Sequence, residues 1–237
     1  MNIFKQTIVT GAEKMGLNIT EEMLEQFEEY SHLLLEENKK YNLTSITKQQ
    51  EVAEKHFLDS LMISRELKYF FNISMIDIGS GAGFPGLPTK IYRPDIEVLL
   101  VDAVRKKVDF MNKVITKLSL KGVNTVHARA EDLAGKIRES YDVAVSRAVA
   151  EMRVLVEYTL PFVKPGGVFI AAKGPGVTGE IILARHAINV LGGQVENIRH
   201  DKLPVSGDPR VIITIRKVKN TPKKYPRKAG KPRKNPL

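Results

Sequence analysis

Short apolar runs alternate with longer amphipathic stretches along the central part of the chain, from Ile73 onward. The runs have the length and the β-branched residues of buried strands, and the stretches between them carry apolar residues at helical spacing. Strands that alternate with helices build βαβ units, and these form a mostly parallel, doubly wound sheet. We therefore predict an α/β fold with strands at 74–78, 96–101, 123–127, 141–145 and 167–172, closed by an antiparallel hairpin of residues 194–200 and 210–218.

The segments on either side of this core follow other patterns. Thr20 is a suitable helix N-cap, two glutamates follow it, and apolar residues then recur at helical spacing. We predict an N-terminal helical cap over residues 1–70, a main domain over residues 71–218 and a tail over residues 219–237. The tail is rich in proline and basic residues and is expected to be extended or disordered when free.

Positive charge is concentrated in the C-terminal tenth of the chain. The chain has 37 Lys or Arg and 27 Asp or Glu, which gives a net charge of +10. Ten of the basic residues and none of the acids lie in residues 216–237, so the body is neutral. Such a block is typical of a segment that binds a polyanion, and its removal should not affect a ligand site in the neutral body. The candidates for RNA contacts are Lys223, Lys224, Arg227, Lys228, Lys231, Arg233 and Lys234.

Several classes of protein are excluded by composition. The chain has no cysteine, which excludes disulfide scaffolds, cysteine-ligated zinc and thiolate nucleophiles. The five histidines show no metal-ligand spacing, so no metal is expected. No apolar run approaches the roughly 18 to 20 residues that cross a bilayer, and the N-terminus does not resemble a secretory signal. We expect a cytoplasmic protein without membrane contact.

A glycine-rich turn follows the first predicted strand. Gly79, Gly81 and Gly83 alternate shortly after Asp77 and precede Phe84. Alternating glycines allow a tight turn and let a ligand lie against bare backbone, at the strand end where open α/β sheets bind ligands. A dinucleotide fingerprint would place glycine at position 84. The observed spacing, led by an acid, instead resembles motif I of class I (Rossmann-like) methyltransferases; a glycine turn with no ligand is the alternative.

Three further strand ends supply candidate site residues. Asp102 ends the second predicted strand and can accept hydrogen bonds from ribose hydroxyls, or cap the next helix. Ala130 and Glu131 follow the third, a position that lies beside adenine in class I methyltransferases, although the segment fits a capped helix start equally well. Ser146 and Arg147 end the fourth, which in those enzymes faces the transferred methyl group. A structural ion pair is the alternative for Arg147.

The fourth strand end also indicates which acceptor is compatible with the site. It lacks the Asn or Asp followed by two prolines and an aromatic residue that many amino-directed methyltransferases have there. An exocyclic amine must lose a proton and profits from a base, whereas guanine N7 presents a lone pair and needs none. Ser146 and Arg147 are the candidate catalytic residues, with the role left open. His56, among apolar neighbours, is interpreted as a packed residue and not as a catalyst.

Together these segments resemble the ribosomal RNA small subunit methyltransferase G family, also called glucose-inhibited division protein B. The resemblance extends over nearly the whole chain and is carried by residues 42–46, 56–61, 77–85, 129–131, 146–148, 173–174 and 221–228. It implies an S-adenosylmethionine-dependent enzyme that forms 7-methylguanosine in small-subunit (16S) ribosomal RNA, with that RNA or the small ribosomal subunit as its partner. It also implies cofactor contacts at Gly79, Phe84, Ala130, Glu131 and Arg147.

Other functions fit parts of the sequence. A nicotinamide-dependent oxidoreductase shares the sheet and the acid after the second strand, but Phe84 replaces the third fingerprint glycine. A non-catalytic RNA-binding or ribosome assembly factor would not need the intact glycine loop and Asp102. A methyltransferase of another RNA or of a small molecule is the third alternative, and a small-molecule acceptor leaves the basic tail unexplained. A monomer is the favoured oligomeric state.

Overall fold

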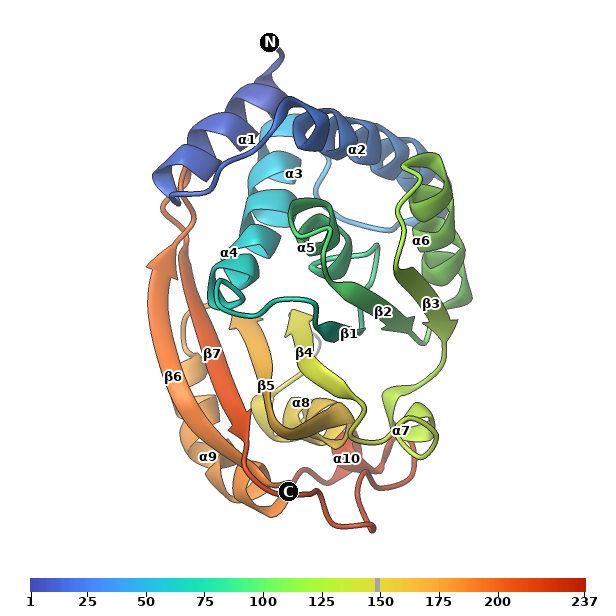
Figure 1. Ribbon diagram of the computed structural model, residues 1–237, viewed down its shortest axis with the longest axis vertical. Helices are drawn as coiled ribbons and strands as arrows, with labels where there is room; N and C mark the ends of the chain where they lie inside the picture. The colour runs from blue at the N-terminus through green and yellow to red at the C-terminus, as the bar shows by residue number, and fades with distance from the viewer. Residues whose placement is uncertain (148–149) are drawn as a thin grey trace.

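A seven-stranded sheet forms the centre of the computed structural model, which describes residues 1–147 and 150–237 (Figure 1). The strands lie in the order β3-β2-β1-β4-β5-β7-β6. The first five are parallel, and β7 is antiparallel to both β5 and β6. This confirms the predicted doubly wound sheet with its closing hairpin. The bounds are β1 Ser74–Ile78, β2 Glu97–Asp102, β3 Val123–His127, β4 Tyr141–Arg147, β5 Val163–Lys173, β6 Gly193–Lys202 and β7 Pro209–Lys217.

Helices cover both faces of this sheet (Figure 1). One face packs against α1 (Ile3–Lys14), α2 (Glu21–Tyr41), α3 (Gln49–Val52), α4 (Asp59–Glu66), α5 (Gly86–Tyr92) and α6 (Arg105–Lys117). The other packs against α7 (Ala130–Leu133), α8 (Met152–Thr159) and α9 (Val177–Val190). A π-helical segment, Ala53–Leu58, joins α3 to α4, and the short 3-10 helix Leu160–Phe162 follows α8.

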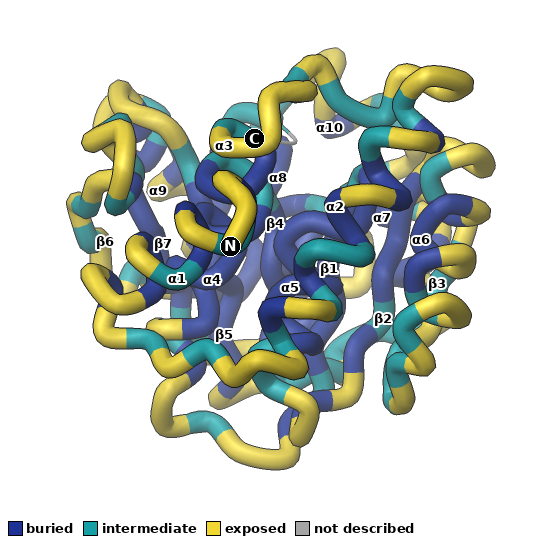
Figure 2. Tube along the Cα trace, turned by 90° about the horizontal axis from the view of Figure 1, so that it is seen from above, coloured by how far each residue is buried: buried dark blue, intermediate teal, exposed yellow. Residues whose placement is uncertain are grey.

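The central strands are buried on both faces, which explains their nearly continuous apolar sequences (Figure 2). Because side chains alternate along a strand, Met75 and Val143 join the core beneath the N-terminal helices, whereas Ile76 and Ala144 join the core beneath α8 and α9. The strand order reverses between β1 and β4, and such a switch point is where open α/β sheets bind ligands.

Helix α2 begins where the sequence indicates. Thr20 caps α2, and its hydroxyl accepts a hydrogen bond from the Met23 amide at 3.2 Å. Phe4, Phe27 and Phe57 are buried in the same core as the sheet residues beneath them. None of the described helices is long and apolar enough to cross a membrane. Ala148, part of the family-like motif at 146–148, lies outside the described residues.

The tail is folded, so the expectation of an extended or disordered segment is wrong. It runs back along α7 and α8 and ends near the short helix α10 (Lys231–Lys234) (Figure 1). Thr221, Tyr225 and Pro232 are buried along its course. The physical reason is polar anchoring to partners far away in sequence, which compositional reasoning about apolar content cannot detect.

Candidate cofactor and active site

Two adjoining compartments lie at the carboxyl ends of the central strands. The first, the Arg147 compartment, has a volume of about 390 Å³, and the second, the Glu131 compartment, of about 300 Å³. Gly79 and Asp102 line both, so the two compartments meet at these residues. The Arg147 compartment is further lined by Leu43, Thr44, His56, Ser80, Gly81, Ala82, Phe84, Lys107 and Arg147. The Glu131 compartment is further lined by Ile78, Val101, Ala103, Ala128, Arg129, Ala130, Glu131, Tyr158, Gly230 and Arg233.

The glycine loop shapes the floor between these compartments. Gly79 and Gly81 have φ angles of +74° and +60°, a region that L side chains rarely adopt. A Cβ added at Gly81 would meet nothing within 4 Å, so open space lies above this backbone. Gly83 lines neither compartment, because its Cα faces the core, where a Cβ would lie 2.5 Å from both Leu87 and Tyr30.

Asp102 holds the loop in place with both carboxylate oxygens. Oδ2 accepts a hydrogen bond from the Gly81 amide at 2.9 Å, and Oδ1 accepts one from the Val104 amide at 2.9 Å, just before α6. Each oxygen keeps a second lone pair, so a ribose hydroxyl can still donate to it. The structural and ligand-binding interpretations of Asp102 are therefore compatible.

Asp77 supports the same loop from below. Its Oδ2 accepts a hydrogen bond from the Gly86 amide at 2.8 Å. Oδ1 is buried and has no hydrogen-bond partner among the described residues. Burial raises the pKa of this carboxyl to about 7, against the lowering effect of the Gly86 hydrogen bond. The acid that leads the glycine motif is thus a buried support and lines neither compartment.

Phe84 forms part of an aromatic stack at the Arg147 compartment. Its ring lies 5.1 Å from Tyr30 with an interplanar angle of 3°, and 4.7 Å from His56 with an angle of 18°. The Tyr30 hydroxyl donates to the Ala82 carbonyl, which ties α2 to the glycine loop. The Arg147 guanidinium carbon lies 5.4 Å from the Phe84 ring centre, within cation–π distance. The N-terminal helices thereby complete the wall of the site.

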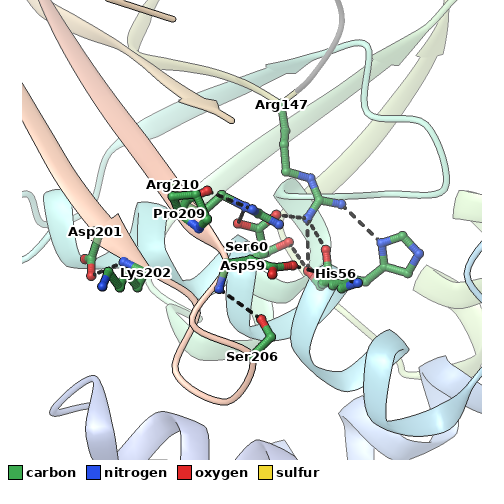
Figure 3. Close-up of polar contacts among 11 residues, drawn as sticks. His56, Asp59, Ser60, Arg147, Asp201, Lys202, Ser206, Pro209 and Arg210 are labelled. Carbon is green, nitrogen blue, oxygen red and sulfur yellow. Dashed lines mark hydrogen bonds and ion pairs between the residues drawn. The ribbon is translucent and has the colours of Figure 1, made fainter. Parts of the chain in front are cut away.

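Arg147 extends from the end of β4 to the π-helical segment and α4 (Figure 3). Its Nη1 donates to Asp59 Oδ2 at 3.1 Å and to the Lys55 carbonyl at 2.9 Å. Arg210, from β7, donates to the other oxygen of Asp59 at 3.0 Å. Arg147 therefore has the ion pair considered as the alternative, and it also lines the compartment. Asp59 and the Lys55 carbonyl hold the Arg147 guanidinium at the wall of the compartment.

His56 lines the Arg147 compartment, which sequence reasoning missed. Its Nε2 lies 2.8 Å from Thr44 Oγ1, and its Nδ1 lies 3.4 Å from Arg147. Burial, followed by the charge of Arg147, lowers the pKa of His56 to about 3, so the ring is neutral at neutral pH. It is packed, as predicted, but on a site residue. The π-helical turn that carries it, a feature common at functional sites, has no recognisable sequence pattern.

Ser146 does not reach either compartment. Its side chain is fully buried, and Oγ donates to the Ile78 carbonyl at 2.7 Å. This bond joins the ends of β4 and β1, so the serine positions the strand end. Arg147 is the one of the two candidates that lines a compartment.

The predicted RNA-binding residues of the tail divide into three groups. Arg227 pairs with Glu157, and Arg233 lines the Glu131 compartment. The other five line no compartment and, like Arg233, are exposed: Lys223, Lys224, Lys228, Lys231 and Lys234. Across the described residues, no group of three or more histidines or acids could hold a metal ion.

The sheet order and the site at its strand ends define a class I, Rossmann-like methyltransferase. Solved structures share the fold: precorrin-6y C5,15-methyltransferase from Geobacter metallireducens GS-15 has a TM-score of 0.53 at 19% identity, covering 73% of this chain and 90% of that one. The M. jannaschii TYW2 complex with AdoMet has a TM-score of 0.53 at 15% identity, covering 68% and 77%.

Residues 23–206 match the sequence profile of the family described as rRNA small subunit methyltransferase G, and the chain belongs to this family. The ribosomal RNA small subunit methyltransferase G of Pelotomaculum thermopropionicum is 48% identical over all of both chains. That of Acetivibrio thermocellus is 46% identical over 98% of this chain and 96% of its own.

Proposed function

We propose that this protein is a cytoplasmic, S-adenosylmethionine-dependent enzyme that forms 7-methylguanosine in the 16S RNA of the small ribosomal subunit. The observation that carries the proposal is the pair of adjoining compartments at the strand ends of a class I methyltransferase fold, in a chain that belongs to the small subunit methyltransferase G family. An assembly factor without catalysis would not require the open glycine loop.

The residues of the two compartments fit this cofactor. The open space above Gly81 accommodates a ligand against the backbone, and Asp102 retains lone pairs for ribose hydroxyls. Ala130 and Glu131, with the apolar residues beside them, would hold the adenine in the Glu131 compartment. S-adenosylmethionine supplies a methyl group bound to a sulfonium sulfur. When the acceptor takes the methyl group, the sulfur leaves as a thioether and keeps the electron pair of the broken bond. The donor methyl would then face Phe84 and Arg147 in the other compartment.

The chemistry of the Arg147 compartment favours guanine N7 as the acceptor. His56 is its one histidine, and a pKa of about 3 makes it a poor base at neutral pH. Asp102 is engaged by two backbone amides, and Lys107 and Arg147 are cations. A lone-pair acceptor such as N7 needs no proton removed, so alignment at attack distance can supply the catalysis, worth about 7 to 11 kcal/mol.

The test is methyl transfer in vitro to small ribosomal subunits and to deproteinised 16S RNA, followed by mass mapping of the product. We expect a single 7-methylguanosine. The single-turnover rate at saturating cofactor should be flat from about pH 6 to 8.5, because no obligatory base titrates. A product methylated on an exocyclic amine, or a rate that rises steeply with an essential pKa near neutrality, would contradict the N7 assignment.

A further inference from the structure

The basic tail begins at a buried polar anchor. Lys217 is fully buried at the end of β7, and its Nζ donates to the Leu160 carbonyl and to Thr221 Oγ1, each at 2.6 Å. The same ammonium lies 3.1 Å from Glu139. Arg138 donates to the carbonyls of residues 221, 222 and 225. Lys217 and Arg138 therefore fix the first turn of the tail to the body of the protein.

A second anchor holds the middle of the tail on α8. Glu157 is fully buried there, and Arg227 donates to its carboxylate through Nε at 2.9 Å and Nη2 at 2.6 Å. The Arg227 backbone amide donates to the same carboxylate at 2.8 Å. Breaking a buried ion pair leaves an uncompensated charge, which is strongly unfavourable. Arg227 is thereby committed to the fold, and it sets the direction of the residues that follow.

These anchors deliver the end of the tail to the Glu131 compartment. The Gly230 amide donates to Glu131 Oε1 at 2.9 Å, across 99 residues of sequence. Gly230 and Arg233 line the compartment together with Ala130 and Tyr158. The Tyr158 pKa is raised by burial and then by the Glu131 carboxylate, as expected for side chains packed together. The tail thus both orients Glu131 and closes one side of the cavity.

We propose that residues 230–233 form a wall of the cofactor site, in which Gly230 fixes the Glu131 carboxylate and the Arg233 guanidinium covers the purine of the bound nucleoside. This inference rests on the proposed function, because it takes the nucleoside to be the adenosine end of S-adenosylmethionine. A planar guanidinium stacks readily on an aromatic ring. It follows that the tail is required for tight cofactor binding, against the sequence-based expectation that the neutral body alone holds the ligand.

The test is calorimetric titration of the full-length protein with S-adenosylmethionine and with S-adenosylhomocysteine, which carries the same adenosine. Truncation would also remove the Thr221 and Arg227 anchors, so point variants are used. Arg233→Ala should weaken both ligands by about twofold to fivefold, the order expected for loss of a cation–π contact made by an exposed side chain. Lys234→Ala removes the same charge from the adjacent, exposed position outside the compartment and should leave both affinities unchanged.

A second readout follows the tail itself. Trypsin should cleave the exposed tail lysines only when the tail detaches, and a ligand that binds only the attached state reduces detachment by the factor 1 + [L]/Kd. At a cofactor concentration ten times Kd, we therefore expect about tenfold slower tail cleavage in the wild type. Wild-type protein that binds no S-adenosylmethionine would contradict the proposed function and this inference together. Wild-type binding with an unchanged Arg233→Ala affinity and no tail protection would overturn the tail wall alone.

Discussion

Asp59 accepts a hydrogen bond from Arg147 at 3.1 Å, although 88 residues separate them, and its other oxygen accepts one from Arg210. The carboxylate is almost fully buried, and Figure 3 shows it together with Arg147 and Arg210. It joins α4, the end of β4 and the start of β7 at the edge of the Arg147 compartment. Asp59 is therefore a positioning residue for Arg147.

Replacing this carboxylate should reduce both stability and methyl transfer. Asp59→Ala leaves two partly buried guanidinium groups without a counter-charge, and we expect the free energy of unfolding to fall by about 3 to 5 kcal/mol. Urea denaturation measures this loss. Asp208→Ala removes a carboxylate from the exposed pair with Lys55, where the loss should stay below about 1 kcal/mol. Equal stabilities of the two variants would show that Asp59 does not stabilise the contact between α4, β4 and β7.

His56 should make the protein less stable in mild acid. Its folded pKa of about 3 lies below the ordinary value of 6.5, so between these pH values the unfolded chain binds the proton that the folded chain excludes. The destabilisation caused by His56 is absent above pH 6.5 and grows as the pH falls, at about 1.4 kcal/mol per pH unit. Asp77, with its pKa raised from 3.8 to about 7, acts in the opposite direction in this range.

A variant without the His56 imidazole separates the effect of His56 on stability from that of Asp77. His56→Phe keeps a ring on Phe84 but cannot be protonated, so its unfolding free energy measured in urea should rise relative to that of the wild type as the pH falls from about 6 to 4. His186→Gln, at an exposed position on α9, serves as the control and should parallel the wild type. Parallel curves for His56→Phe and the wild type would mean that His56 is solvated.

Gly81→Arg should abolish binding of S-adenosylmethionine. The new side chain would occupy the open space above the loop, where a Cβ now meets nothing within 4 Å. Gly166→Arg is a matched control, because Gly166 also has a positive φ and open space but lies far from the compartments, in β5. Both variants place an arginine at a positive φ angle, so calorimetry on the folded proteins tests the effect of position. Retained affinity in Gly81→Arg would exclude the Arg147 compartment as the cofactor site.

The exposed lysines of the tail should set the salt dependence of RNA binding. Each phosphate contact contributes a slope of about −0.7 to −0.9 in log affinity against log salt. If Lys223, Lys224 and Lys228 each contact a phosphate, their joint replacement by serine should reduce the magnitude of this slope by about 2 units. RNA titrations at several salt concentrations measure it, and cofactor affinity should not change, because none of the three lines the Glu131 compartment.

The matched control removes three exposed lysines that lie outside the tail. Replacement of Lys68, Lys117 and Lys121 by serine changes the net charge equally and should leave the slope close to that of the wild type. Identical slopes in all three proteins would mean that the tail makes no phosphate contacts. The folded body would then have to supply RNA recognition.

The sequence by itself determined the parts of the molecule that depend on local periodicity. Strands β1 and β3 have the predicted bounds, and the other five differ at their ends. Strands β4 and β5 end later than predicted because Arg147 and Lys173, which carry no apolar signal, continue the strand pairing. The glycine loop and the residues after β2 and β3 were also placed correctly at the strand ends, because a parallel sheet brings every such end to one edge.

Only the tertiary structure decided which charged groups serve the fold and which remain free. Arg227 and Arg233 belong to the same basic block as Lys228 and Lys234, yet one is paired with buried Glu157 and the other lines the Glu131 compartment. Composition records a net charge, but it cannot assign partners that are 70 residues apart in sequence, as Glu157 and Arg227 are. The physical reason is that burial of a charge depends on a specific opposite charge at short range, and only the folded chain brings the two together.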